Sequence, residues 1–269
     1  MSTIKKAKKS RYDIKFLKFN LLLVTILASV FAILSPRYTV VSYATSRDNF
    51  LKITLTKSIT LGCLDELDEL PNKCSSQEAS ILEATASGMA FKEVNSSTYV
   101  LTADHFCSAR ADVPEIILTN SDVETSLWVT GPSGTNWPAE IVYTDKSYDL
   151  CLLRTRIKIK EGLEISRDIP VIGDRIFAVT APLGINEKGV SVEFDGIFSG
   201  CDAYDRCYFT IPAIYGSSGS LVLDKDEKIV GMIQMTPADF NAMSIGVSSR
   251  TIRQFLQSAE DYLDIDLLD

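Results

Sequence analysis

Gly216-Ser217-Ser218-Gly219-Ser220-Leu221-Val222-Leu223 is the stretch with the strongest local signal in the chain. Glycines on both sides of a serine allow the backbone to turn tightly and to direct its N–H groups into a cleft. The apolar run that follows at once has the residue types of a buried strand. Taken alone, the stretch also fits a common Ser/Gly-rich hairpin loop, so its meaning depends on the residues that precede it.

A serine becomes a nucleophile when a base accepts its proton and an acid orients that base. His105 is the only histidine in the chain, and it follows a strand-like segment. Asp149 directly precedes an apolar run, whereas its competitor Asp145 does not. A lone histidine is often structural and an acid before a strand is often a turn residue, so each signal is weak alone. In the order His105, Asp149, Ser218 they indicate a serine hydrolase.

Short apolar runs separated by Gly, Pro, Asn and Asp predict an all-β sandwich or a pair of barrels. A hairpin is expected from Ala86–Phe91 and Thr98–Thr102, and a break near Lys158–Arg167 divides the strands into two groups. The other strands expected are Ile116–Leu118, Leu127–Thr130, Ala139–Tyr143, Leu150–Arg154, Arg175–Thr180, Val190–Phe198, Arg206–Ile211, Ser220–Leu223, Lys228–Gln234 and Met243–Val247.

Two helices are expected because apolar residues recur with helical spacing in two places. One covers Ser76–Ala86, where Ser76 is a fair N-cap. The other covers Thr251–Tyr262, near the end of the chain.

Three motifs, around His105, Asp149 and Ser218 in chain order, resemble those of the trypsin-like (chymotrypsin-fold) serine proteases. The likeness is strongest to the bacterial Deg/HtrA-type and glutamyl-endopeptidase-like branches. Leu101–His105 looks like the family's LTA-x-H block, and Gly216–Ser220 resembles G-[DN]-S-G-[GS]. Ala139–Asp145, followed by Asp149–Leu153, resembles A-x-V-x-x-D…DLALL. The similarity covers roughly residues 84–257. It implies two six-stranded antiparallel β-barrels with a C-terminal helix, and no PDZ domain is expected.

The resemblance also implies a role for each site residue. Ser218 would attack the peptide carbonyl, His105 would accept its proton, and Asp149 would orient His105. The backbone N–H groups of Gly216 and Ser218 would bind the oxyanion. Asp104 stands before the base where Ala or Asn is usual, and its negative charge could raise the pKa of His105. No cofactor and no metal are expected.

The substrate pocket is expected to include Tyr215, Gln234, Met235 and Thr236. None of these is acidic, which argues against a preference for Lys or Arg in the substrate. A small or medium apolar side chain is the preference that the sequence favours.

The chain has six cysteines, and all of them follow an apolar N-terminal segment. An even number of cysteines in an exported domain indicates disulfides. Short loops suggest Cys63–Cys74 and Cys201–Cys207, which leaves Cys107–Cys151 to join the base to the acid. A zinc site is the alternative, but the chain has no CxxC motif and only one histidine.

The N-terminal segment Phe16–Leu34 is nearly all apolar and follows a cluster of basic residues. Its 19 residues could just cross a bilayer, and the basic flank predicts a cytoplasmic N-terminus. A cleaved signal peptide is the rival interpretation, with Ser42-Tyr43-Ala44 as a cleavage site. The expected organisation is a basic tail (1–15), a transmembrane signal-anchor (16–35), a linker and N-terminal extension (36–83), and a protease domain (84–262).

The net charge of −8 excludes one class of function. Because basic residues gather before the apolar segment, the rest of the chain is more acidic still, which argues against nucleic-acid binding. The sequence therefore predicts a serine endopeptidase that acts on polypeptides and is membrane-anchored with its catalytic domain periplasmic or extracellular, or secreted if the segment is cleaved. The alternative is a catalytically silent protease fold that serves as a membrane-tethered binding module.

Overall fold

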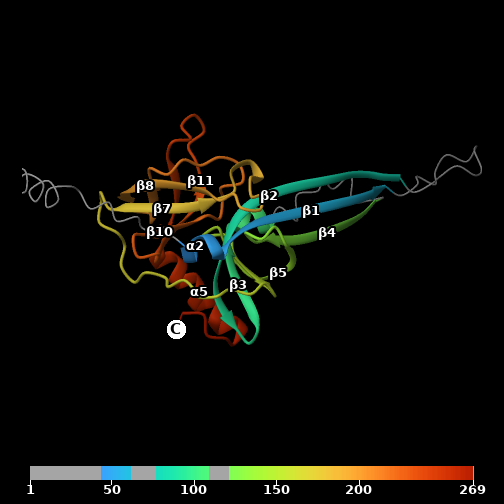
Figure 1. Ribbon diagram of the computed structural model, residues 1–269, viewed down its shortest axis with the longest axis horizontal. Helices are drawn as coiled ribbons and strands as arrows, with labels where there is room; N and C mark the ends of the chain where they lie inside the picture. The colour runs from blue at the N-terminus through green and yellow to red at the C-terminus, as the bar shows by residue number, and fades with distance from the viewer. Residues whose placement is uncertain (1–43, 62–76, 109–120, 269) are drawn as a thin grey trace, which may run out of the picture. The chain divides into compact units, whose positions relative to one another are not determined.

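The first half of the fold is a closed antiparallel barrel with the strand order β1-β2-β3-β6-β5-β4. The structure is a computed structural model that describes residues 44–61, 77–108 and 121–268 (Figure 1). A short helix, α2 (Ala44–Asn49), precedes the barrel, and another, α3 (Asp104–Ser108), follows its third strand. The strands are β1 (Phe50–Leu61), β2 (Gln77–Val94), β3 (Ser97–Thr102), β4 (Ser121–Thr130), β5 (Asn136–Asp145) and β6 (Leu150–Thr155).

The second half is another closed antiparallel barrel, with the order β10-β11-β12-β9-β8-β7. A turn of 3-10 helix, η2 (Pro182–Gly184), follows its first strand, and α5 (Ser249–Leu263) follows its last. The strands are β7 (Arg175–Thr180), β8 (Val192–Cys201), β9 (Arg206–Phe209), β10 (Leu221–Asp224), β11 (Ile229–Met235) and β12 (Ser244–Ser248). The two six-stranded barrels and the C-terminal helix confirm this part of the predicted fold class, whereas the transmembrane helix expected before them lies outside the described residues.

Continuous apolar runs become strands here because both of their faces are buried. Successive side chains of a strand point to opposite faces. In β6, Leu150 and Leu152 pack between the barrels, while Cys151 and Leu153 fill the interior of the first barrel. In β10, Val222 points into the second barrel and its two neighbours point out of it. This double burial explains why these strands lack the alternation of a half-exposed sheet.

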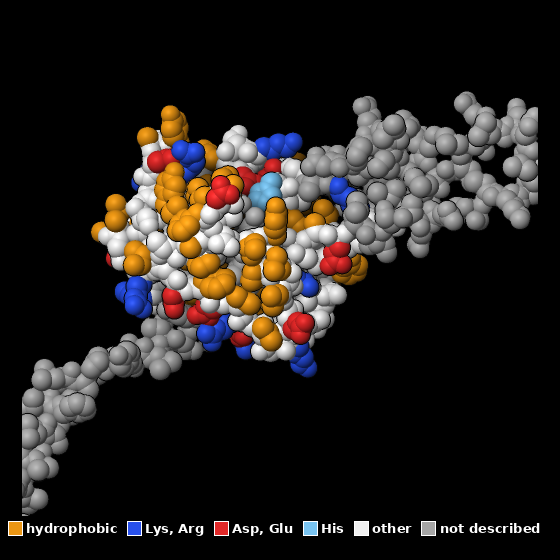
Figure 2. Space-filling view, turned by 90° about the horizontal axis from the view of Figure 1, so that it is seen from above, with side chains coloured by type: hydrophobic (Ala, Val, Ile, Leu, Met, Phe, Trp, Pro, Cys, Tyr) orange, Lys and Arg blue, Asp and Glu red, His pale blue; other side chains and the backbone are white. Residues whose placement is uncertain are grey.

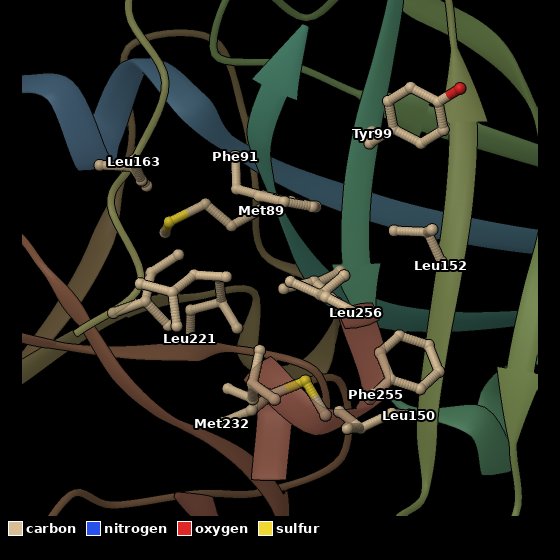
Figure 3. Packing of buried hydrophobic residues seen from close by; sticks show 14 of the residues in the cluster. Met89, Phe91, Tyr99, Leu150, Leu152, Leu163, Leu221, Met232, Phe255 and Leu256 are labelled. Carbon is tan, nitrogen blue, oxygen red and sulfur yellow. The ribbon is translucent and has the colours of Figure 1, made fainter. Parts of the chain in front are cut away.

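The two barrels and α5 share one hydrophobic cluster (Figure 3). Met89 and Leu152 come from the first barrel, Leu221 and Met232 from the second, and Phe255 from α5. Each fully buried side chain of this kind contributes about 1.5–3 kcal/mol. The cluster therefore holds together two halves that contribute different residues to the site described below.

The helix expected over 76–86 is wrong, because residues Gln77–Ala86 form the first half of β2. They pair antiparallel with β1, from Leu61 opposite Gln77 to Ile53 opposite Ala86. Helical spacing of small apolar residues was a weak signal, and the backbone hydrogen bonds of the barrel outweigh it. β1 itself arises within the stretch that was expected to be a linker and N-terminal extension.

Several expectations concern residues outside the described part of the chain. These are the apolar segment Phe16–Leu34, the Cys63–Cys74 pair and the strand Ile116–Leu118. Among the residues that the structure does describe, no helix is both long and apolar enough to cross a membrane.

Candidate active site

His105 lies in the first turn of α3, directly after β3, and its side chain is 51% exposed. Its Nδ1 is 2.8 Å from Oδ2 of Asp149. The backbone N–H of the same histidine donates to Oδ1 of Asp149 at 2.7 Å. One carboxylate therefore holds both the backbone and the ring of His105, which leaves Nε2 for another partner. In Figure 2 the single histidine, pale blue, lies at the surface beside acidic and hydrophobic side chains.

Asp149 occupies the turn between β5 and β6 with a left-handed backbone (φ 52°), which is uncommon for a residue other than glycine. The side chain of Gln234, on β11 of the other barrel, donates to the carbonyl of Asp149 at 3.0 Å and to that of Tyr148 at 2.5 Å. The competing acid, Asp145, instead accepts hydrogen bonds from Ser147 and Tyr148 within the turn. Of the two acids, Asp149 is the one that contacts His105.

The electrostatic surroundings of His105 favour its charged form. The hydrogen bond from Asp149 raises the pKa of His105 above its ordinary value of about 6.5. Burial acts in the opposite direction, while the negative charges of Asp149 and Asp104 raise this pKa further. Asp104 is buried, and its Oδ2 accepts a hydrogen bond from Ser108 at 2.7 Å. Within the described residues its Oδ1 has no hydrogen-bond partner.

Ser218 belongs to the serine loop, defined here as Gly216–Ser220, which leads into β10. Its Oγ donates a hydrogen bond to the carbonyl of Gln234 at 3.0 Å. No hydrogen bond between Ser218 and His105 occurs in the described part of the chain. The hydroxyl of Ser218 is thus bonded to β11.

The two glycines of the serine loop are required by its close packing. Gly216 and Gly219 have φ angles of 91° and 86°. A Cβ at Gly216 would lie 2.3 Å from the carbonyl oxygen of Ala181, and one at Gly219 would lie 2.2 Å from that of Ser87. Any side chain there would displace the backbone on either side of the loop.

Four consecutive carbonyls, those of residues 215–218, are all hydrogen-bonded. The carbonyl of Tyr215 accepts from Leu183 N–H at 2.6 Å, and that of Ser217 accepts from Ser220 N–H at 3.1 Å. The carbonyls of Gly216 and Ser218 both accept from Ser87, at 2.7 and 2.9 Å.

The bonds to the carbonyls of Tyr215 and Ser217 set the directions of two backbone N–H donors, those of the residues that follow them. Because a trans peptide holds its C=O and N–H on opposite sides, the N–H groups of Gly216 and Ser218 point away from the carbonyls that precede them. Neither N–H is bonded to another backbone group of the described residues. Free N–H donors beside a serine hydroxyl are what stabilisation of an oxyanion requires.

A cavity of about 660 Å³ opens next to Ser218. Of the four pocket residues expected from the sequence, Tyr215, Met235 and Thr236 line it. Gln234 does not, because its buried side chain reaches the turn of Asp149 instead. The rest of the lining is Ala213, Ile214, Ser217, Ser218, Ile233, Pro237, Ala238, Asp239, Phe240 and Asn241.

The segment 237–241 was missed in the sequence because it follows β11 as an unremarkable loop. Two hydrogen bonds hold this segment beside the cavity. The carbonyl of Asn241 accepts from Ala213 N–H at 3.0 Å, and Thr236 Oγ1 donates to the carbonyl of Met243 at 2.9 Å. The loop adds Asp239 to the lining, where no acidic residue was expected, and this side chain is exposed.

The structure contains the disulfides Cys107–Cys151 and Cys201–Cys207, as the spacing suggested. Cys107 lies two residues after His105 on α3, and Cys151 lies two residues after Asp149 on β6. Both are buried in the first barrel. This bond therefore joins the two elements that carry His105 and Asp149.

Comparisons with known proteins agree with this architecture. A search of curated proteins found no match. A crystal structure of the serine endoprotease from Yersinia pestis has a TM-score of 0.55 at 14% identity, over 80% of this chain. This chain covers only 64% of that protein, so the likeness describes the fold of one part. The inactive form of Rv3671c from M. tuberculosis, a serine-to-alanine mutant, has a TM-score of 0.54 at 14% identity, over 84% of this chain and 95% of that one.

The comparison with family models concerns more than half of the chain. The trypsin-like peptidase domain matches residues 86–232, which include His105, Asp149 and Ser218. The match spans the end of the first barrel's β2, the serine loop and part of β11. The chain therefore belongs to the trypsin-like peptidase domain family.

Proposed function

We propose that this protein is a serine endopeptidase in which Ser218 is the nucleophile, His105 the general base and Asp149 the residue that orients the base. The observation that carries the proposal is the bond between His105 Nδ1 and Asp149 Oδ2, at 2.8 Å. It fixes the imidazole tautomer in which Nε2 can accept a proton. The serine loop supports the proposal because the N–H groups of Gly216 and Ser218, which bond to no backbone carbonyl of the described residues, belong to the loop that carries the attacking hydroxyl.

The reaction would proceed through an acyl-enzyme. Ser218 Oγ attacks the carbonyl carbon of the scissile peptide bond while His105 Nε2 takes its proton, and the N–H groups of Gly216 and Ser218 bind the oxyanion. The tetrahedral intermediate collapses, the C–N bond breaks, and His105 gives its proton to the leaving amine. A water molecule then loses a proton to His105 and attacks the ester. The acid product leaves, and the proton returns to Ser218.

One observation favours the alternative, a catalytically silent binding module. The hydroxyl of Ser218 donates to the carbonyl of Gln234 instead of to His105. In an active enzyme this hydroxyl must change its partner, which requires rotation about the Cα–Cβ bond of one residue. In a silent module it would keep its bond to β11.

Labelling with a fluorophosphonate separates these two functions, because the reagent reacts with activated serines. The purified full-length chain should be labelled, and peptide mass mapping should find the adduct on Ser218 and not on its neighbour Ser217. Ser218→Ala and His105→Ala should both abolish labelling. A folded, disulfide-intact wild type that is not labelled would contradict the enzymatic function and favour the binding module.

We further propose that the catalytic domain lies on the outer side of a membrane. The support is the basic flank of Phe16–Leu34 together with two disulfides, which persist in oxidising compartments. Resistance to carbonate extraction, with labelling of intact cells by an impermeant amine reagent, is the result expected for an anchor. A shortened chain in the soluble fraction would indicate cleavage, and labelling only after permeabilisation would contradict the proposed topology.

A further inference from the structure

Ser87, on β2 of the first barrel, is fully buried and makes an unusual number of contacts for one small side chain. Its N–H donates to the carbonyl of Ser218 at 2.9 Å, and its Oγ donates to the carbonyl of Gly216 at 2.7 Å. The same Oγ accepts from the N–H of Ala181 at 2.9 Å. Its own carbonyl accepts from the hydroxyl of Thr102 at 2.8 Å. One serine thus touches the serine loop twice and the turn before η2 once.

These contacts cross from one barrel to the other. Ser87 and Thr102 belong to the first barrel, whereas Ala181 and the serine loop belong to the second. The carbonyl oxygen of Ser87 would lie 2.2 Å from a Cβ on Gly219, which shows how closely β2 approaches the loop. The serine loop is therefore held against β2 with little freedom to move.

The hydroxyl of Ser87 also joins the two segments that determine the direction of the Gly216 N–H. It links the carbonyl of Gly216 to the N–H of Ala181. Ala181 begins the turn that carries Leu183, whose N–H holds the carbonyl of Tyr215. Leu183 has a left-handed backbone (φ 56°), a conformation that a leucine adopts only when its surroundings impose it.

We propose that Ser87 is a positioning residue for the oxyanion site: its hydroxyl and N–H hold the carbonyls of Gly216 and Ser218, which follow the two donors in the chain, and so fix the serine loop in the conformation in which the N–H groups of these two residues face the reacting carbonyl. The inference rests on the proposed peptidase function. Without the hydroxyl, the carbonyl of Gly216 and the N–H of Ala181 are buried without a partner, a cost that rotation of either peptide would relieve. Movement of the turn that begins at Ala181 would loosen the bond from Leu183 N–H to the Tyr215 carbonyl, and the Gly216 N–H, which shares that peptide, would turn away from the oxyanion.

The test compares Ser87→Ala with the matched control Ser166→Ala in the purified full-length protein. Ser166 is also nearly buried, and its Oγ likewise donates to a backbone carbonyl (Asp168, 2.8 Å) and accepts from a backbone N–H (Asp168, 3.3 Å). The substitution therefore removes the same pair of bonds at a place that does not touch the serine loop. Thermal unfolding of each variant reports the loss of stability separately.

The readout is the kinetics of inactivation by a fluorophosphonate, separated into the maximal rate and the concentration for half-maximal rate. Deleting an oxyanion donor costs about 10²–10³-fold in rate, so misdirecting one should lower the maximal rate of Ser87→Ala roughly 10- to 100-fold. The half-maximal concentration should change less than about 3-fold, because the pocket is unaffected. Ser166→Ala should retain the wild-type rate.

A wild-type maximal rate in Ser87→Ala, or an equal loss in Ser166→Ala, would overturn this inference while leaving the peptidase function intact. No reaction in the wild type would overturn the peptidase function and this inference with it. If Ser87→Ala does not fold, Ser87→Cys decides, because the thiol fills the space of the hydroxyl but bonds weakly as donor and as acceptor. A reduced maximal rate in Ser87→Cys supports the inference, and a wild-type rate refutes it.

Discussion

Removal of the Cys107–Cys151 disulfide by a double alanine substitution should destabilise the protein more than removal of Cys201–Cys207. The first bond closes a loop of 44 residues and the second a loop of 6. A cross-link stabilises mainly by restricting the unfolded chain, so its contribution grows with the logarithm of the loop length. The chain-entropy relation gives about 4 kcal/mol for the long loop and about 2 kcal/mol for the short one.

The difference between the two variants is the sharper quantity, because both lose a disulfide and both gain two alanines. It should be about 1.8 kcal/mol in the free energy of unfolding, measured by guanidinium chloride denaturation followed by far-UV circular dichroism. The Cys107–Cys151 variant should also react more slowly with a fluorophosphonate, because this bond joins the elements that carry His105 and Asp149. Equal losses of stability, or a larger loss for the short loop, would refute the reasoning from loop length.

Four further predictions concern the site itself. Because neutral His105 is the base and its pKa is raised, activity should increase with pH through a midpoint above about 6.5. Asp104→Asn should lower that midpoint, because it removes a negative charge near His105. An unchanged pH profile in this variant would contradict the effect of the Asp104 charge on the pKa of His105. The same shift means that the stability contributed by His105 is complete below about pH 6.5 and is lost as the pH rises through its raised pKa, which unfolding curves across this range should show. Asp149→Asn should lower kcat by about 10⁴-fold, because the amide would hold His105 in the tautomer that cannot accept a proton at Nε2. Asp145→Asn should change kcat little. Similar losses of kcat in the two variants would contradict the assignment of Asp149 as the residue that orients His105. Gly219→Ala should abolish fluorophosphonate labelling of Ser218 or prevent folding, because its Cβ would lie 2.2 Å from the carbonyl oxygen of Ser87 on β2. A stable variant that is labelled normally would show that the serine loop is not packed against β2 as described.

The sequence predicted most strands because their signal is local. In β6 and β10 both faces are buried, and this produces apolar runs that are visible without any tertiary information. The first half of β2 lacks such a run, since it is rich in Ala and Ser with helical spacing. It becomes a strand because β1 pairs with it, and β1 lies in a stretch whose residues alone indicate nothing definite.

The site residues also divide into those that the local sequence reveals and those that only tertiary contacts reveal. His105 and Asp149 could be found in the sequence because each stands next to a recognisable strand, and because the histidine is single. Ser87 and the loop 237–241 could not, because a serine within a strand and a loop after one are ordinary features. Their importance comes only from which segments the barrels bring close to them.

Each barrel makes a contact that positions part of the site on the other barrel. Ser87 of the first barrel holds the loop that carries Ser218 in the second, while Gln234 of the second barrel holds the turn that carries Asp149 in the first. Each barrel therefore positions the proposed catalytic residue of the other. Neither barrel alone could place base and nucleophile together, so the hydrophobic cluster between them determines the geometry of the site as well as the stability of the fold. Activity should thus be lost in any state in which the barrels separate, even if each remains folded.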